Sequence, residues 1–331
     1  MAKTDIVLTW VDQNDPEWQA EKKKYDPEGN TPDSGDVRYR DWDSLKYVFR
    51  GIEKFMPWVN KIYFVTWGHV PEWLNTGAEK LRIVNHRDFI PEEYLPTFNS
   101  NTIDLNIFRI KDLSEQYILF NDDTFVIKPV SPEEYFHNGK PADMACISPQ
   151  PIVRDSIRNI ELNNLEIIND HFSIEDIRKN RNKWVNFGKY GSYSLRTLMF
   201  MRFNTIIGIF EPHVPISHLK SVYEKLWDLE YEEYHSTCQN KFRTKLDISD
   251  WLARSWQLLS GDFEPRSRYF GKLVSASDLQ GVRDILWRSK YKTVCINDDD
   301  SVTPEAFPGL RDNINAELCK LLPERSGFEK E

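Results

Sequence analysis

Residues 117–123 have the sequence Tyr-Ile-Leu-Phe-Asn-Asp-Asp, an apolar run that ends in two adjacent carboxylates. Such a short apolar run is typical of a strand that is buried on both faces of a parallel sheet. A second run of this kind, Asp5-Ile-Val-Leu-Thr-Trp-Val11, ends at Asp12. Ligands of doubly wound sheets bind beyond the carboxyl ends of the strands. We therefore predict that Asp12, Asp122 and Asp123 lie at a ligand-binding edge.

Strand and helix patterns alternate around these two runs, which predicts an α/β sheet with mostly parallel strands. A helix is expected from Asp41, because apolar residues then recur at helical spacing until Pro57 stops the pattern. In the same half we expect a loop over residues 13–35, strands over 61–67 and 81–84, and a helix over 101–110. Beyond Ser148 the pattern becomes mainly helical. We expect helices over residues 159–169, 173–183, 195–203, 217–229 and 248–259, then a strand over 291–296 and a last helix over 304–322.

The charge balance excludes one broad class of function. The 331 residues include 43 basic and 52 acidic side chains, which gives a formal charge of −9. A general nucleic-acid binder gains its affinity by neutralising phosphates, so this balance argues against that class. The four cysteines, Cys146, Cys238, Cys295 and Cys319, are widely spaced. We expect them to be reduced and mostly buried rather than paired in a disulfide framework.

Neither of the most apolar segments has the length of a targeting or membrane segment. The run at the N-terminus is interrupted by Asp12 before it reaches the length of a secretory signal. The stretch from Leu198 to Phe210 contains Arg202 and falls short of the ~20 residues that cross a bilayer. We therefore expect a cytoplasmic protein without a transmembrane anchor.

Asp122 and Asp123 offer hard oxygen ligands after a predicted strand. Carboxylates of this kind bind Mg²⁺ or Mn²⁺ and let the cation bridge a pyrophosphate. The alternative is a turn in which the aspartates cap backbone amides. A second acidic stretch, Asn297 to Asp300, is better explained as a loop before a helix, because acidic residues favour a helix N-terminus.

His213 lies between Pro212 and Pro215, and two prolines stiffen the backbone and fix where the imidazole points. A positioned histidine is the usual group to take a proton from an acceptor hydroxyl. His218, five residues later in the chain, is an equally plausible candidate from spacing alone.

Arg243 belongs to a short basic cluster, residues 241–245, that precedes a helix expected near Asp247. Both features favour phosphate binding, although a solvated charge run is the simpler explanation. The same two explanations hold for Arg38, Arg40 and Asp41, where a basic pair meets the start of a helix.

Taken together and in this order, the segments resemble the four conserved blocks of the Stealth family. These proteins are bacterial capsule and exopolysaccharide phosphotransferases, related to the catalytic subunit of animal N-acetylglucosamine-1-phosphotransferase. The matching segments are residues 5–12, residues 38–123, residues 199–223 with an extension to Asp247, and residues 294–299.

The resemblance implies a fold and a reaction. The expected fold is an α/β, GT-A-like (Rossmann-type) mixed sheet core with a largely helical C-terminal half. Residues 1–148 would form the nucleotide-sugar and metal-binding part, and residues 149–331 would complete the same catalytic unit. A hexose or HexNAc 1-phosphate would move from a UDP-sugar to a glycan hydroxyl. The products would be a phosphodiester and UMP.

The resemblance also implies roles for single residues. Asp123, His213 and Arg243 would be catalytic, and Asp122 and Asp123 would bind Mg²⁺ or Mn²⁺. The expected substrate-binding residues are Asp12, Arg40, Asp41, Asn99, Arg109 and Asn121. The implied partners are a donor resembling UDP-GlcNAc and a glycan acceptor, free or lipid-linked, with no nucleic acid. Peripheral contact with the inner face of the membrane or with capsule-assembly proteins is part of the same expectation.

Two other functions stay open at this point. A GT-A glycosyltransferase would form a glycosidic bond and release UDP instead of UMP. A non-catalytic glycan-binding protein would use the 11 Trp and 14 Tyr residues for stacking and would consume no nucleotide-sugar.

Overall fold

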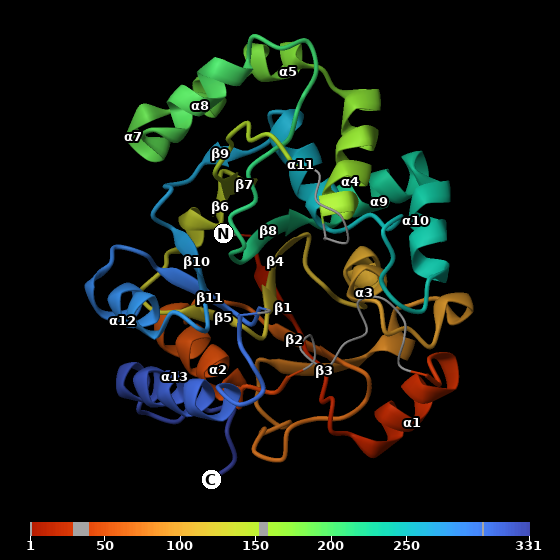
Figure 1. Ribbon diagram of the computed structural model, residues 1–331, viewed down its shortest axis with the longest axis vertical. Coiled ribbons are helices and arrows are strands. Elements are labelled where there is room, and N and C mark those ends of the chain that lie inside the picture. The colour runs from red at the N-terminus through yellow and green to blue at the C-terminus, as the bar shows by residue number, and fades with distance from the viewer. Residues whose placement is uncertain (1, 29–39, 152–157, 300) are drawn as a thin grey trace.

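The computed structural model describes residues 2–28, 40–151, 158–299 and 301–331, and its centre is a five-stranded sheet (Figure 1). The strand order is β3-β2-β1-β4-β8. The strands are β1 (Thr4–Thr9), β2 (Ile62–Thr66), β3 (Leu81–Asn85), β4 (Gln116–Asn121) and β8 (Ile216–Leu219). The first four are parallel to their neighbours, and β8 is antiparallel to β4. The expected mixed α/β sheet is confirmed.

Side chains of the central strands alternate between two hydrophobic clusters, one on each face of the sheet. In β1, Val7 packs into one cluster, whereas Ile6 and Leu8 pack into the other. This alternation explains why the strands are apolar throughout, since neither face meets water. One face is covered by α2 (Leu45–Phe55), α12 (Leu279–Arg288) and α13 (Phe307–Leu321). The other is covered by α3 (Ser100–Asn106), α4 (Arg158–His171), α9 (Lys220–Leu229), α10 (Tyr231–Gln239) and α11 (Trp251–Leu259).

Two small sheets connect distant parts of the chain. In the first, β11 (Thr293–Asn297) lies between β10 (Gly271–Ser275) and β5 (Thr124–Val126). This sheet ties the C-terminal part of the chain to the residues that directly follow Asp123. The second sheet joins β6 (Phe136–His137), β7 (Lys140–Asp143) and β9 (Glu264–Pro265).

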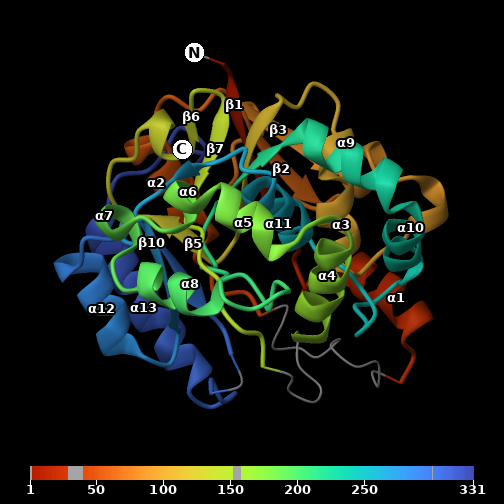
Figure 2. The same ribbon diagram turned by 90° about the horizontal axis from the view of Figure 1, so that it is seen from above.

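Beyond residue 148 the chain is largely helical, as expected. Four short helices, α5 (Ile174–Lys179), α6 (Arg181–Trp184), α7 (Phe187–Tyr190) and α8 (Tyr193–Phe200), follow α4. Figures 1 and 2 show α5, α7 and α8 together at one end of the molecule. In the described part of the chain, no helix combines the length and the apolar character needed to cross a membrane.

The predicted loop over residues 13–35 is wrong in its first part, where the structure has helix α1 (Pro16–Tyr25). Asp15 caps this helix, because its side chain accepts a hydrogen bond of 2.8 Å from the amide of Trp18. Proline is well tolerated at the first helical position. Trp18 is buried in a small aromatic cluster with Phe98. Residues 29–35 lie outside the described residues.

The predicted helix over residues 217–229 also needs correction, because it begins only at Lys220. Residues Ile216–Leu219 instead form the edge strand β8, in which Ser217 lies opposite Ile118. The pairing with β4, a contact distant in sequence, outweighs the local helical pattern. The structure also contains α10 and α12, which were not predicted, and its last helix begins at Phe307 rather than Pro304.

The expectation for the cysteines is confirmed. All four are free thiols; Cys146, Cys238 and Cys295 are buried, and Cys319 is exposed.

Candidate active site

A cavity of about 410 Å³ lies beyond the carboxyl ends of β1 and β4. We call it the central cavity. Asp122, Asp123, His213 and Arg243 all line it, although they come from three separate segments of the chain. The structure therefore brings together the residues to which the resemblance gives catalytic and metal-binding roles.

Two further cavities adjoin the central one and share residues with it. The inner cavity, of about 210 Å³, shares Asp122 and Asp123 and is also lined by Arg40 and Asp41. The outer cavity, of about 980 Å³, shares His213. The three cavities thus follow one another along a single cleft, with the aspartate pair at one junction and the histidine at the other.

Asp123 is fixed by the small sheet of β5 and β11. Its side chain accepts hydrogen bonds from the hydroxyl of Thr124 (3.1 Å) and the thiol of Cys295 (3.2 Å). Its carbonyl accepts a hydrogen bond of 2.9 Å from the amide of Ile296. The residue that follows β4 is therefore held from the far side by a strand more than 160 positions later in the sequence.

Burial raises the pKa of three carboxylates at this edge, and neighbouring carboxylates add to the effect at Asp122 and Asp41. Asp122 is accessible to water but lies on the floor of the cleft, where desolvation and then the charge of Asp123 raise its pKa to about 7. Burial also raises the pKa of Asp123, against the effect of its hydrogen bonds. Burial and the charges of Asp43 and Asp12 raise the pKa of Asp41. Carboxylates that repel one another in this way form a donor set suited to a hard divalent cation.

His213 is exposed at the junction of the central and outer cavities, and its ring centroid lies 5.3 Å from that of Trp251. Its backbone has φ of 46°, a left-handed conformation that is uncommon for a residue other than glycine. The charge of His213 lowers the pKa of Asp123, so the two side chains are electrostatic neighbours. The arrangement places an imidazole beside the acidic pair.

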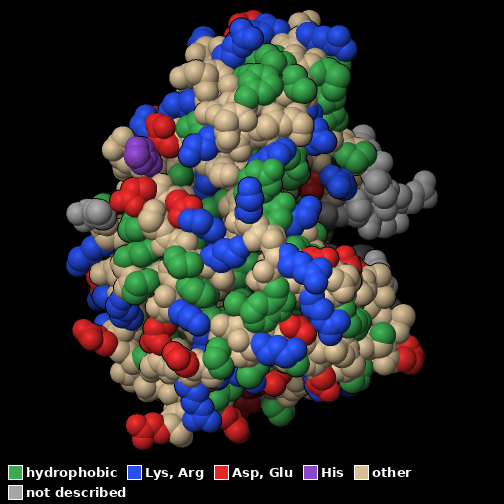
Figure 3. Space-filling model, turned by 90° about the vertical axis from the view of Figure 1, so that its left-hand side faces the viewer, with side chains coloured by type: hydrophobic (Ala, Val, Ile, Leu, Met, Phe, Trp, Pro, Cys, Tyr) green, Lys and Arg blue, Asp and Glu red, His purple; other side chains and the backbone are tan. Residues whose placement is uncertain are grey.

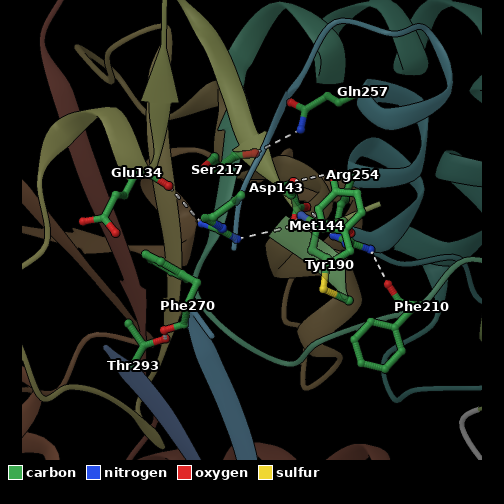
Figure 4. A network of polar contacts seen from close by, with 11 residues as sticks. Glu134, Asp143, Met144, Tyr190, Phe210, Ser217, Arg254, Gln257, Phe270 and Thr293 are labelled. Carbon is green, nitrogen blue, oxygen red and sulfur yellow. Dashed lines mark hydrogen bonds and ion pairs between the residues drawn. The ribbon is translucent and has the colours of Figure 1, made fainter. Parts of the chain in front are cut away.

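A buried ion pair supports the segment that carries His213 (Figure 4). Arg254, which is fully buried, donates hydrogen bonds to Asp143 (2.6 Å) and to the carbonyls of Phe210 and Met144 (3.0 Å each). Burial alone would raise the pKa of Asp143, but the charges of Arg254 and Arg266 lower it. Sequence reasoning missed this network, because Arg254 lies more than 100 positions from Asp143 and Met144.

Arg243 reaches into the central cavity from the loop that precedes α11, and its guanidinium contacts the hydroxyl of Ser100. The helix after this loop begins at Trp251 rather than near Asp247, so Arg243 is not close to its N-terminus. Arg243 faces Asp104 and Asp250, whose pKa values burial raises and the arginine charge lowers. For Asp250 the resulting pKa is about 6.

Asp247 holds the loop of Arg243 in place. It is fully buried, and one of its oxygens accepts hydrogen bonds from Asn99 (2.7 Å), Asn101 (3.3 Å) and the amide of Thr244 (3.0 Å). The other accepts from Asn240 (2.8 Å) and the hydroxyl of Thr244 (2.7 Å). The sequence pattern places Asp247 only at a helix start, whereas the structure makes it the hub of the loop.

We expect Asp247→Ala to lower the free energy of unfolding by about 3 kcal/mol, because it leaves several buried donors without an acceptor. Urea unfolding followed by tryptophan fluorescence measures the change. Asp247→Asn is the matched control, since it keeps one oxygen and should lose clearly less stability. Equal stability of Asp247→Ala and the unmodified protein would contradict the role of Asp247 as a hub.

The other predicted substrate-binding residues fall into two groups. Arg40, Asp41 and Asn121 line the inner or central cavity, and the backbone amide of Asp12 donates a 2.7 Å hydrogen bond to the ring of His69 beside it. Arg40 is itself held by Asp298 (3.7 Å) and by the carbonyl of Val302 (3.0 Å). Arg38 and Asp300 lie outside the described residues.

Asn99 and Arg109 have surroundings that do not suit direct substrate contact. Asn99 is fully buried, and its amide is engaged with Asp247 and with the amide of Asn101, which it caps at the start of α3. Arg109 lies over the rings of Phe108 and Trp227, at 4.7 Å from each centroid. Both side chains contact other residues of the protein, so in this structure they hold neighbouring segments in position.

The structure also separates the two histidines that sequence spacing could not. His218 lies in β8 and is fully buried, and its ring nitrogens have no hydrogen-bond partner among the described residues. Burial lowers its pKa to about 3. His213, by contrast, is open to the cleft.

Comparisons with known proteins find family matches in the N-terminal half of the chain and relatives along its whole length. Residues 4–29 match Stealth protein CR1, conserved region 1, and residues 38–143 match Stealth protein CR2, conserved region 2. The chain is 42% identical to the capsular polysaccharide phosphotransferase WcwK of Streptococcus pneumoniae, over 100% of this chain and 99% of the relative. It is 38% identical to the receptor polysaccharide phosphotransferase WefC of Streptococcus oralis, over 99% of this chain and 100% of the relative.

Among solved structures, the chain is similar to the galactosyltransferase LgtC with a TM-score of 0.36 and 13% identity, over 93% of this chain and 95% of LgtC. That likeness is too loose to align individual residues.

Proposed function

Because the chain belongs to the Stealth family, we propose that it is a phosphotransferase that moves a sugar 1-phosphate from a UDP-sugar to a glycan hydroxyl during capsule or exopolysaccharide synthesis. One observation carries the proposal. An aspartate pair, a histidine and an arginine line one cavity of a chain that is similar to polysaccharide phosphotransferases over its full length. Phosphoryl transfer needs these parts, namely charge neutralisation, a base for the nucleophile and a phosphate clamp.

The donor diphosphate would lie over Asp122 and Asp123, between the inner and central cavities. These two carboxylates would hold Mg²⁺ or Mn²⁺, which supplies charge neutralisation on the phosphate oxygens when it is bound. Among the described residues, no group of three or more His, Cys, Asp or Glu side chains forms a ready-made cage. Two protein ligands fit Mg²⁺ in particular, which usually takes its other ligands from phosphate and water.

The uridine and sugar would flank the diphosphate along the cleft. The inner cavity, with Arg40 and Asp41, offers a closed polar end for one of them. Arg243, from the opposite wall of the central cavity, is placed to contact a phosphate oxygen with two parallel N–H groups. Its partners Asp104 and Asp250 would keep the guanidinium oriented before the donor binds.

We expect Arg243→Lys to lower turnover by roughly 10- to 100-fold, because lysine keeps the charge but loses the planar fork that suits a phosphate. Steady-state assays with saturating donor measure this loss. Lys245→Arg, a change in the same basic cluster, is the control and should leave turnover intact. Full activity of Arg243→Lys would show that only a diffuse positive charge is needed at this position.

The acceptor would enter through the outer cavity. Aromatic side chains line this cavity, including Tyr193, Tyr269 and Tyr291, and rings of this kind stack on sugar faces. Because His213 lines both the outer and the central cavity, an acceptor hydroxyl that reaches the donor phosphate must pass the imidazole. In this proposal His213 removes the hydroxyl proton as the oxygen attacks.

In the proposed step the acceptor oxygen bonds to the β-phosphorus of the donor and gives its proton to His213. The bond between that phosphorus and the bridging oxygen breaks, and UMP leaves with the bridging oxygen. Residues 1–148 supply the aspartates and residues 149–331 supply His213 and Arg243, so we propose that the two parts act as one catalytic unit. The hydrophobic cluster that contains Val7 includes side chains from both parts, and this supports the proposal.

Product identity tests the reaction type. With a UDP-sugar, Mg²⁺ and a competent glycan, we expect release of UMP and a phosphodiester signal in the phosphorus NMR spectrum of the product. Release of UDP without that signal would instead identify a glycosyltransferase that attacks the anomeric carbon. Glycan binding without consumption of any nucleotide-sugar would point to a non-catalytic protein.

A further inference from the structure

The segment from residue 177 to 210 has a charge pattern unlike the rest of the chain. It contains no Asp or Glu, in a protein whose formal charge is −9. Its basic residues are Arg178, Lys179, Arg181, Lys183, Lys189, Arg196 and Arg202. This segment covers the second half of α5 and all of α6, α7 and α8, which lie at one end of the molecule (Figures 1 and 2).

Large apolar side chains are exposed on the same segment. Phe187 is 54% exposed, Leu195 60%, Met199 49% and Phe203 43%. Leu195 and Met199 are four residues apart in α8 and so share one face of that helix. Ser194 and Thr197 of α8 are buried, and the hydroxyl of Thr197 accepts a hydrogen bond of 3.2 Å from the backbone amide of Ile147. We call the four exposed residues the apolar ridge.

Among the described residues, three basic side chains of this segment lack acidic partners, whereas Arg178 and Lys179 pair with Glu175 and Asp176. In the part of the chain that the structure describes, Lys189, Arg196 and Arg202 form no ion pair with a carboxylate, whereas Lys183 pairs with Glu264. In Figure 3 basic and hydrophobic side chains are intermixed over the upper end of the molecule, where these helices lie. An exposed apolar ridge flanked by unpaired cations is unusual on a soluble surface and marks an interaction site.

We propose that the apolar ridge and the cations beside it dock the protein on an anionic membrane surface. Apolar side chains on a short amphipathic helix enter the boundary between headgroups and acyl chains, while Lys and Arg pair with anionic lipids. A phosphate-containing polysaccharide would explain the cations, but it offers no apolar environment for Leu195 and Met199. The combination of both features therefore favours the bilayer.

The position of α8 relates this docking to acceptor binding, and this step of the inference rests on the proposed function. Tyr193 and Arg196 of α8 also line the outer cavity, the proposed entrance for the acceptor. Docking through the apolar ridge would bring that entrance to the membrane surface. An acceptor glycan that is anchored there by a lipid would then reach His213 without leaving the bilayer.

Flotation with lipid vesicles tests the proposal without any turnover, so its failure leaves the reaction type untouched. The full chain should bind vesicles of phosphatidylcholine that contain phosphatidylglycerol, and bind pure phosphatidylcholine much more weakly. Lys189→Gln with Arg202→Gln should lower the partition coefficient by roughly 25-fold, at about fivefold for each basic residue. Lys111→Gln with Arg87→Gln, two exposed basic positions elsewhere, is the matched control and should change little.

A second pair of variants isolates the apolar contribution. Leu195→Asn with Met199→Asn should lower the partition coefficient by about tenfold or more. Leu229→Asn with Val70→Asn changes exposed apolar side chains elsewhere and is the control. Thermal unfolding of every variant shows that the fold is intact. Absence of binding to anionic vesicles would overturn the proposal. Loss of binding only in the charge variants would also overturn it, because the apolar ridge would then contribute nothing to membrane binding.

Discussion

Replacing Asp123 with asparagine is expected to lower turnover by about 10³-fold or more while the protein stays folded. The substitution removes one charge and one cation ligand without a change in volume, and a lost metal contact weakens transition-state stabilisation by several kcal/mol. The hydroxyl of Thr124 and the thiol of Cys295 donate to the two carboxylate oxygens, and the asparagine keeps an acceptor for only one of them. Turnover with saturating donor and Mg²⁺ measures the effect.

The stability of Asp123→Asn should not fall together with its activity. Burial raises the pKa of Asp123, so the folded protein holds the ionised carboxylate less favourably than the unfolded chain does. That unfavourable contribution is absent below the unfolded pKa, grows as the pH rises from the unfolded to the folded pKa, and is fully present above the folded pKa. Asp123→Asn removes it, and we expect the midpoint of thermal unfolding at neutral pH to be unchanged or higher. A severe loss of stability would mean that the lost activity reports misfolding.

Asp299→Asn is the matched control for this prediction. Asp299 also follows a β-strand in an Asn-Asp-Asp sequence, but it hydrogen-bonds Ser301 and does not line any of the three cavities. Its substitution should leave turnover within about twofold. If Asp123→Asn kept the activity of Asp299→Asn at limiting Mg²⁺, the proposed cation site would be wrong.

His213→Asn is expected to lower turnover by ~10²–10⁴-fold, the range typical of general acid-base catalysis, with donor affinity largely kept. Asparagine is the better substitution than alanine here. His213 has φ of 46°, and asparagine tolerates this left-handed conformation whereas alanine is strained in it. The imidazole is removed, but the backbone that leads into β8 keeps its conformation.

Two measurements separate a proton acceptor from a structural histidine at this position. Donor affinity, measured by calorimetry without acceptor, should change by no more than a few fold, because His213 lies on the acceptor side of the central cavity. His137→Asn, at an exposed histidine outside all three cavities, should have no effect on turnover. If the turnover of His213→Asn stayed within tenfold of that of the unmodified protein, His213 would not be the group that accepts the proton of the acceptor hydroxyl.

The sequence alone determined the strands and helices whose pattern is local. Strands β1, β2, β3, β4 and β11 and helix α2 are where the apolar runs and helical spacing predict them. The central strands are mainly apolar because both of their faces are buried. Helix α2 is apolar only at helical spacing because one of its faces is buried. The same local logic placed Asp122 and Asp123 directly after a central strand, at the edge where ligands bind.

The elements that sequence reasoning missed depend on partners elsewhere in the chain. Helix α1 was expected to be a loop, because its own residues are mostly polar and only Trp18 is buried, against Phe98. Strand β8 carries a helical pattern and becomes a strand only because β4 offers it an edge. Local propensity is a weak preference that a long-range contact can outweigh.

The candidate site divides in the same way. Residue type and spacing singled out Asp123, His213 and Arg243 but did not separate His213 from His218, and the family resemblance added Asn99 and Arg109 as substrate-binding residues. The tertiary structure buried His218 and Asn99, turned Arg109 onto Trp227 and opened His213 to the cleft. It also supplied Asp143, Arg254 and Asp247 as supports. Chemistry belongs to a side chain and is visible in the sequence, whereas access and orientation arise from contacts between residues far apart in the chain, which only packing determines.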